Sequence, residues 1–116
     1  MKTTLAGLVF VLTLLLVFAA FQVVPYLAYR RTQDLNWLNH ASPSEIRDTT
    51  HSALTYVLGD PHDSFGLVQT YGDRSSIPYL RFALARQPAS EIKSGEMECT
   101  WIHGRLALER VLKLPK

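Results

Sequence analysis

Four histidines and one cysteine are the side chains in this sequence best suited to catalysis or metal binding. The histidines are His40, His51, His62 and His103, and the cysteine is Cys99. No histidine belongs to an HExxH or HxxxH pattern, which are the spacings that place two metal ligands on one face of a helix. We therefore expect no catalytic residues, no metal ligands and no cofactor.

The segment 60–63, which has the sequence DPHD, is the densest group of such residues and leaves a metal site open as an alternative. One histidine with neighbouring carboxylates needs further ligands, so His51 or His103 would have to fold onto His62. A turn in which Asp63 caps the following helix explains the same residues with fewer requirements. We expect the helix cap.

Nucleophilic catalysis would need a serine or cysteine beside a base that a third group orients. Ser64 is close to His62 in sequence, and Cys99 and His103 stand four residues apart, on one face of a helix. Neither pair is accompanied by a glycine-rich elbow. The single cysteine also excludes an intrachain disulfide and a zinc site of several thiolates. We expect a buried, inert thiol at Cys99 and a partly exposed imidazole at His103.

The elements that must position these side chains fall into two unlike parts, of which the first is a candidate membrane helix. The run from Leu5 to Leu27 carries no charge, and about 20 apolar residues suffice to cross the hydrocarbon core of a bilayer. Tyr26 and Tyr29, with Arg30 and Arg31 after them, give the order of aromatic and basic residues that is typical of a membrane exit. We expect residues 1–29 to form a transmembrane signal anchor.

A cleaved signal peptide is the alternative to a retained anchor. The segment 17–19 would permit cleavage before Ala20, but the apolar run exceeds the roughly 7–15 residues of a signal-peptide core and continues past that point. Lys2 on one side and Arg30 and Arg31 on the other nearly balance the positive-inside rule. A short basic start is typical of an anchor whose amino end stays in the cytoplasm. We expect a single-pass inner (plasma) membrane protein with an extracytoplasmic, periplasmic soluble part.

The soluble part is predicted to be all-α, because no segment alternates in polarity for long enough to indicate a strand. A juxtamembrane linker at residues 30–43 leads into a helical domain at residues 44–116. Ser42 and Pro43 indicate the start of the first helix, and Gly59 indicates its end. The predicted helices are 44–58, 62–71, 77–86 and 96–112, with a polar loop at 89–95.

The predicted helices resemble short HEAT repeats of the type related to phycobilisome lyases. The segment 71–84, YGDRSSIPYLRFAL, has the turn, the proline and the leucine pair of a first repeat helix. The segment 97–112, MECTWIHGRLALERVL, is similar to the second helix, and HSALTYVLGDP from His51 is similar to the second helix of a preceding repeat. The resemblance covers residues 44–112. It implies two helical hairpins that form a non-catalytic scaffold with a concave contact surface.

Two repeats are fewer than the three that a solenoid needs to bury a continuous core, so we expect uncovered apolar faces. No later helix covers the final one, and Trp37 lies in a linker where an aromatic residue can act as a contact anchor. The expected partner contacts are Trp37, Leu106, Val111 and Leu112. A position of Trp37 at the membrane interface is the alternative, and Trp101 is expected in the core.

The charge balance argues against nucleic acid, and no motif indicates a small-molecule substrate. Lys and Arg total 12 against 10 Asp and Glu, and no clustered basic face with aromatic platforms occurs. We expect a membrane-anchored interaction or scaffold module rather than an enzyme, such as an accessory subunit of a membrane complex. It would contact the lipid bilayer and a protein partner or a second copy. The alternative is an exported soluble enzyme or metal-binding protein with a cleaved signal peptide.

Overall fold

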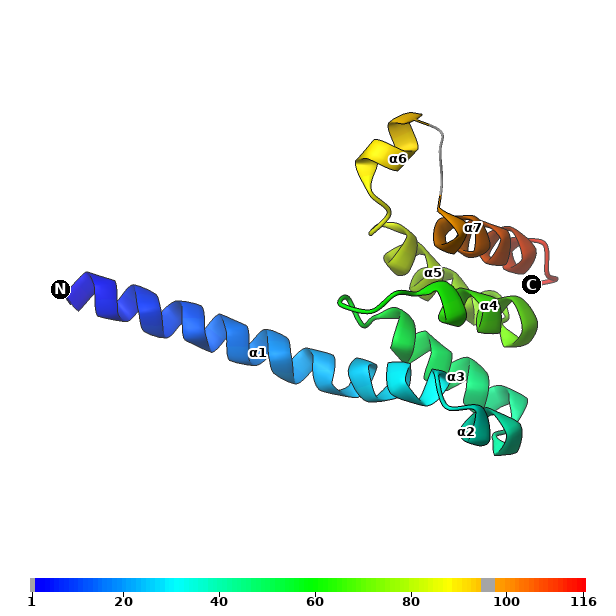
Figure 1. Ribbon diagram of the computed structural model, residues 1–116, viewed down its shortest axis with the longest axis horizontal. Helices are drawn as coiled ribbons and strands as arrows, with labels where there is room; N and C mark the ends of the chain where they lie inside the picture. The colour runs from blue at the N-terminus through cyan, green and yellow to red at the C-terminus, as the bar shows by residue number, and fades with distance from the viewer. Residues whose placement is uncertain (1, 95–97) are drawn as a thin grey trace.

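One long helix leads into a bundle of shorter helices (Figure 1). The computed structural model describes residues 2–94 and 98–116, and the regular elements in these two ranges are all helical. The elements are α1 (Lys2–Thr32), α2 (Leu35–His40), α3 (Pro43–Leu54), α4 (His62–Tyr71), the 3-10 helix η1 (Arg74–Ser76), α5 (Ile77–Leu84), α6 (Ala89–Ser94) and α7 (Cys99–Leu112). The prediction of an all-α fold with a long apolar N-terminal helix is confirmed.

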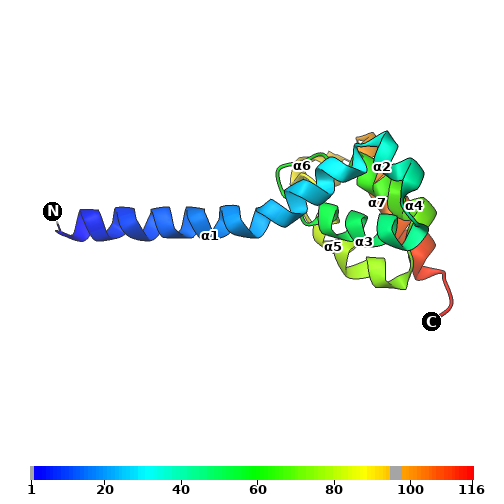
Figure 2. The same cartoon turned by 90° about the horizontal axis from the view of Figure 1, so that it is seen from below.

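The N-terminal part of α1 stands apart from the bundle, and its C-terminal part packs on it (Figure 1). By length and composition α1 can span a membrane, and none of its most apolar stretch is buried within the protein. Figure 2 shows that α1 bends where it reaches the bundle. Pro25 lies inside the helix. Because proline lacks the N–H that would bond the carbonyl four residues earlier, it accounts for a kink in this part of α1.

Local side chains determine where α3 begins, as predicted, and they also determine where η1 begins. Ser42 Oγ accepts a hydrogen bond from the backbone N–H of Glu45 at 3.2 Å, and Pro43 occupies the first turn of α3, where its missing N–H costs nothing. Asp73 and Ser76 form a capping box at η1, in which the Asp73 N–H donates to Ser76 Oγ at 3.2 Å. These caps fix the entry of α3 and the turn that leads from α4 into α5.

The hydrophobic core lies between α4, α5 and α7, and α3 packs on α4 and α5. Phe65 on α4 packs edge-to-face against Trp101 on α7, with ring centroids 6.2 Å apart. Trp101 is buried, so its predicted core position is confirmed. Gly104 allows α7 to approach closely, because a Cβ at this position would lie 2.7 Å from Phe65 and 2.8 Å from Leu84. The buried core residues are Leu54, Phe65, Val68, Leu80, Ala83, Trp101, Ala107 and Val111.

Two arginines close the C-terminal ends of α4 and α7 from other helices. Arg110 on α7 donates to the carbonyls of Val68 and Gly72, each at 3.3 Å. Arg74 on η1 donates to the carbonyl of Leu112 at 3.2 Å and to one just beyond α7 at 3.1 Å. A cation suits a helix C-terminus because the carbonyls there lack partners within the helix. Both arginines therefore stabilise contacts within the bundle.

The helix predicted at 44–58 is wrong at its C-terminal end, because α3 stops at Leu54. Hydrogen bonds from distant side chains take up the backbone groups of the following residues: Gln22 binds two of them and Arg86 binds two others. Leu58, which was expected to extend the buried stripe, is instead 74% exposed. Tertiary contacts thus replace helical hydrogen bonds over this loop.

The region between α5 and α7 also differs from the prediction. The polar loop expected at 89–95 contains the short helix α6, because the Pro88 carbonyl accepts the Glu91 N–H at 3.1 Å and so begins a new turn. α5 ends at Leu84, two residues before the predicted end at 86, and turns follow it. Proline therefore separates two helices here instead of ending one at a loop.

The last helix begins later than expected. α7 starts at Cys99, directly after Glu98, whereas the prediction started it at residue 96. Glu96 and Met97, which were expected in its first turn, lie outside the described residues. The predicted end at Leu112 is confirmed.

Candidate functional site

One face of α1 docks on α3 and joins the apolar helix to the domain. Gln22, Pro25, Ala28 and Thr32 recur along this face at spacings of three and four residues. Pro25, Ala28 and Thr32 are buried, and Gln22 is half-buried. The apolar side chains of the same stretch, such as Val24, remain exposed on other faces. Because α1 is one continuous helix, its apolar part and its docked part belong to a single element.

Gln22 binds the backbone of the loop after α3 through both ends of its amide. Its Nε2 donates to the Thr55 carbonyl at 3.1 Å, and its Oε1 accepts the Val57 N–H at 2.9 Å. The Gln22 amide thus acts as donor and acceptor for the backbone of this loop. A polar residue in an apolar run is costly to bury unless both of its polar atoms are paired, as they are here.

Arg86, on the turn after α5, holds the same loop from the other side. Its guanidinium donates to the carbonyls of Tyr56 at 3.1 Å and Gly59 at 2.9 Å. Burial lowers the pKa of Arg86 below its usual value, and the charge of Asp60 partly opposes this shift. The two terminal nitrogens of the guanidinium can donate to two nearby carbonyls at once, so Arg86 restrains both ends of the segment between Tyr56 and Gly59.

Three tyrosines gather where α1 enters the bundle. Tyr56 packs edge-to-face against Tyr26 at 5.5 Å between ring centroids, and its ring is tilted against that of Tyr29 at 5.2 Å. Gly59 allows this packing, because a Cβ at that position would lie 2.8 Å from both Tyr29 and Tyr56. Tyrosine is enriched where a membrane protein leaves the bilayer, since its ring is apolar and its hydroxyl is polar.

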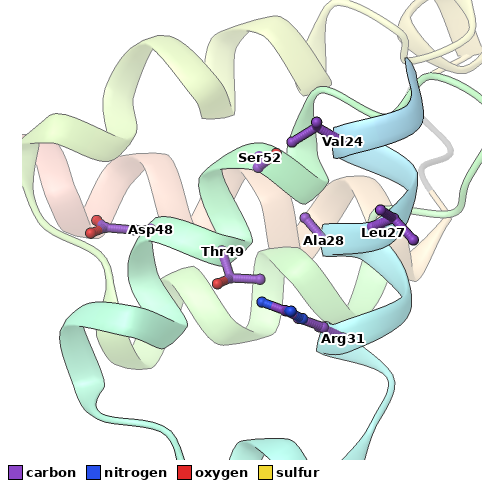
Figure 3. Close-up of a pocket in the computed structure, with 7 residues that line it drawn as sticks. All are labelled: Val24, Leu27, Ala28, Arg31, Asp48, Thr49 and Ser52. Atoms are coloured by element: carbon purple, nitrogen blue, oxygen red, sulfur yellow. The ribbon is translucent and has the colours of Figure 1, made fainter. Parts of the chain in front are cut away.

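A shallow pocket of about 380 Å³ lies along the line where α1 meets α3. Figure 3 shows Arg31 reaching from α1 toward Thr49 on α3, while Ala28 faces α3 and Leu27 points away. Arg31 and Asp48 are the charged residues of its lining, and the rest of the surface is mainly apolar. A surface of this kind can contact lipid or protein. The lining residues are Val24, Leu27, Ala28, Arg31, Asp48, Thr49 and Ser52.

His62, Cys99 and His103 come together at the start of α4 and α7. Cys99 Sγ lies 3.5 Å from His62 Nε2, and the imidazole centroids of His62 and His103 are 4.9 Å apart. Cys99 is exposed, so the prediction of a buried thiol is wrong. The reason is that α7 enters the core only from Trp101 onward, which leaves its first residue at the surface.

The predicted Asp63 cap is wrong, and the Ser64–His62 pair, which was considered only as an alternative, can also be compared with the structure. The backbone N–H of His62 donates to Asp60 Oδ1 at 3.0 Å, whereas Asp63 lies 3.2 Å from His62 Nδ1 and does not cap the helix. Ser64 Oγ is buried and has no hydrogen-bond partner among the residues that the structure describes. A Ser64–His62 pair for nucleophilic catalysis is therefore not formed.

Comparison with models of known protein families, with curated proteins and with solved structures finds no match. The helices assigned to the two hairpins, α3 with α4 and α5 with α7, are in contact. Their resemblance to HEAT repeats stays a prediction.

His51, the other histidine considered for a metal site, lies elsewhere in the bundle. It is 7% exposed, stacks on Tyr79 at 4.4 Å between ring centroids, and its Nε2 lies 2.6 Å from Ser76 Oγ. Because Ser76 Oγ also accepts the Asp73 N–H, its own hydrogen is free to point at a neutral imidazole. His51 is therefore a structural residue that links α3 to the start of α5.

We expect the domain to lose stability below about pH 6.5 because of His51. Burial lowers the pKa of His51 below the ordinary 6.5, although the carboxylates of Asp48 and Asp73 partly oppose the shift. Below about pH 6.5 the His51 imidazole binds a proton more readily in the unfolded chain than in the folded domain. The free energy of unfolding is therefore highest above this pH and declines as the pH falls toward the pKa of the folded state. In His51→Gln the midpoint of urea unfolding, measured with chelator present, should change less between about pH 7.5 and 5.5 than in the parent. His40→Gln is the exposed control; an unaltered pH dependence in His51→Gln would contradict the assignment.

The predicted partner contacts fall into three environments. Trp37 is half-buried on α2. Its backbone N–H donates to Asp34 Oδ1 at 3.4 Å, and this hydrogen bond is part of the helix cap. Leu106 and Leu112 are 46% and 44% exposed, as a contact surface requires. Val111 is fully buried in the core, so its expected place on an uncovered face is wrong. α4 and α5 cover that side of α7.

The sequence analysis assigned no contact to two residues that hold the loop after α3, Gln22 and Arg86. Gln22 and Thr13 are the strongly polar residues of the apolar run, and this was the available signal that Gln22 has a partner inside the protein. Arg86 carries no such signal, because surface turns commonly contain charged residues.

Proposed function

We propose that this chain is a single-pass membrane protein whose helical domain is a non-catalytic interaction module held at the membrane surface. The observation that carries the proposal is the continuity of α1, which passes from a free apolar stretch to a buried face on α3 without a break. Such a connection orients the domain relative to the bilayer, whereas a flexible linker would leave it free to rotate.

The length of the free part of α1 supports a membrane span. Residues 4–21 precede the docked face, and as an α-helix they extend about 27 Å, close to the hydrocarbon thickness of about 30 Å. Leu8, Phe10 and Phe21 are among the exposed apolar side chains on this part. The edge of the bilayer then falls near Gln22, where the domain begins.

Other features of the domain agree with a bilayer edge near Gln22. In both views the loop between α3 and α4 reaches toward the free part of α1 (Figures 1 and 2). This loop carries the 74% exposed Leu58 and contributes Tyr56 to the tyrosine cluster. α2 lies at the opposite end of the bundle in Figure 1. The same reasoning puts Trp37 away from the bilayer, where a protein can reach it.

The partner we propose is a protein, either a subunit of a membrane complex or a second copy of this chain. α7 exposes Ile102, Leu106 and Leu112 by 41–46% each, and α2 adds a half-buried tryptophan. Tryptophan, tyrosine and arginine are enriched among the residues that provide most of the energy of protein interfaces, so Trp37 is the proposed anchor and the exposed side chains of α7 add apolar contact area. The resemblance to HEAT repeats supports a scaffold role through such helix faces. We place the domain outside the cytoplasm, because Lys2 opens a typical signal anchor.

The proposal predicts retention in membranes and extracytoplasmic labelling of Cys99. Alkaline carbonate should leave the protein in the membrane pellet, since the apolar part of α1 lies in lipid. Cys99 is the single cysteine and is exposed, so a membrane-impermeant maleimide should label the protein in intact spheroplasts with chelator present. Cys99→Ser is the matched control and should stay unlabelled.

Release of the protein by carbonate would argue for a processed soluble product and against the anchor. Labelling of Cys99 only after the spheroplasts are lysed would place the domain in the cytoplasm and overturn the proposed orientation. The two readouts are independent, so an anchor with the opposite orientation can be recognised.

A further inference from the structure

α4 and α7 begin next to each other, and each presents a metal-binding side chain at its first residue. His62 opens α4, Cys99 opens α7, and His103 follows Cys99 by four residues on the same face of α7. One nitrogen or sulfur atom from each of the three side chains lies within 4.8 Å of the others. The cluster combines one thiol and two imidazoles, and these are the ligand types that bind zinc in proteins.

The spacing of the first ligand pair fits a tetrahedral zinc ion. With Zn–S near 2.3 Å and Zn–N near 2.0–2.1 Å, a sulfur and a nitrogen on one tetrahedron lie about 3.6 Å apart. Cys99 Sγ and His62 Nε2 are 3.5 Å apart. The three ligand atoms lie within 4.8 Å of one another. A movement of the His103 imidazole by about 1 Å therefore brings all three to the distances at which they can bind one ion.

Both imidazoles have a hydrogen-bond partner on the nitrogen that is not needed for the metal. Asp63 Oδ1 lies 3.2 Å from His62 Nδ1, and Gln69 Oε1 lies 3.4 Å from His103 Nδ1. When each Nδ1–H donates to its oxygen, each Nε2 carries the free lone pair that a metal requires. Carboxylate or amide partners of this kind orient metal-binding histidines in general.

Asp60 ties the two helix starts together beneath the cluster. Its Oδ1 accepts the His62 N–H at 3.0 Å and the Thr100 hydroxyl at 3.2 Å. These bonds join the first turn of α4 to the first turn of α7. Asp60 therefore restrains the distance between His62 and Cys99 through one backbone N–H and one side-chain hydroxyl.

Solvent reaches the cluster, which leaves room for a fourth ligand. Cys99 is exposed, and both histidines are half-buried. A pocket of about 380 Å³ borders His62, Asp63 and His103, and α2 lines another part of its wall. Three protein ligands with an accessible fourth position are the arrangement of zinc sites that keep a bound water.

We propose that His62, Cys99 and His103 bind one zinc ion, with water as the fourth ligand. Cys99 binds as the thiolate and releases its proton to solvent, while the two histidines bind through Nε2 in their neutral form. The ion links α4 to α7 directly, so its binding stabilises the folded domain. This site is independent of the membrane anchor and of any protein partner.

Cobalt(II) titration of the purified full chain tests the proposal. The protein is kept in detergent, prepared without a histidine tag and freed of metal with chelator. One equivalent of cobalt should give the near-ultraviolet thiolate charge-transfer band and the visible bands of a tetrahedral ion, and zinc should displace both. His62→Ala, Cys99→Ser and His103→Ala should each weaken binding at least a hundredfold. His40→Ala is the matched control and should bind like the parent.

A second readout does not depend on colour. Zinc should raise the melting temperature of the parent and of His40→Ala but not that of Cys99→Ser, whose far-ultraviolet circular dichroism in chelator should match the parent. Asp63→Asn should weaken cobalt binding about 10–100-fold without altering the shape of the spectrum, because it orients a ligand and does not bind the metal. Absence of the thiolate band in the parent, or equal binding by Cys99→Ser, would overturn the proposal.

Discussion

Replacing Gly104 with alanine should destabilise the domain by about 1–3 kcal/mol, whereas the same replacement at Gly66 should stabilise it by about 0.5–1 kcal/mol. Both glycines lie inside helices, where alanine is favoured by its lower entropy cost. At Gly66 nothing lies within 4 Å of the added Cβ. At Gly104 the Cβ would come within 2.8 Å of the fully buried Phe65 ring, which cannot move aside.

Urea unfolding of the full chain in detergent provides the measurement. The fluorescence of Trp101, which packs against Phe65, reports the loss of the core. The two variants should shift the unfolding midpoint in opposite directions from the parent. A Gly104→Ala variant that is as stable as the parent would show that α4 and α7 do not pack as closely as described.

A chain that begins at Thr32 should be less stable than one that begins at Ala20 by roughly 4 kcal/mol. The shorter chain lacks the docked face of α1, including the buried Ala28 and the two Gln22 hydrogen bonds to the loop after α3. The longer chain keeps that face and omits most of the apolar span. A loss of this size is comparable to the whole stability margin of a small domain, so the shorter chain should also self-associate.

Thermal unfolding and sedimentation of the two chains distinguish the outcomes. We expect the chain from Ala20 to melt cooperatively, and the chain from Thr32 to melt about 15 °C lower or to sediment as oligomers. A chain from Thr32 that is monomeric and equally stable would show that α1 adds nothing to the fold. Gln22→Leu in the longer chain is a finer control, since it removes the two hydrogen bonds and keeps the volume.

Local signals in the sequence were sufficient for the start of α3 and for the turn at η1, although not for the starts of α6 and α7. Ser42 with Pro43, and Asp73 with Ser76, act through backbone groups within three residues, so their pattern alone indicates the cap. The end of α3 was predicted too late for the opposite reason. The groups that stop it, Gln22 among them, lie more than thirty positions away in the chain, and no pattern near Leu54 reveals them.

In the candidate sites too, features that depend on nearby residues could be predicted, and features that depend on packing between helices could not. The pairing of Cys99 with His103 was visible as a spacing of four residues, but the approach of His62 depends on the packing of α4 against α7. The exposure of Cys99 likewise depends on where α7 enters the core. The sequence also showed an apolar run long enough for a membrane, without showing that its last part serves as one wall of the domain.

In the proposed membrane-spanning arrangement, the contacts of Gln22 would couple the domain to the orientation of the span. Transmembrane helices tilt by about 20° on average, and a span adjusts its tilt to match the hydrocarbon layer. Because α1 is continuous into the bundle, a change in tilt turns the whole domain with it, and the kink around Pro25 sets the starting angle. A change in the tilt of the proposed span would therefore change which face of the bundle is turned toward the lipid. Through such a change, the composition of the bilayer would alter how α2 and α7 are presented to a partner.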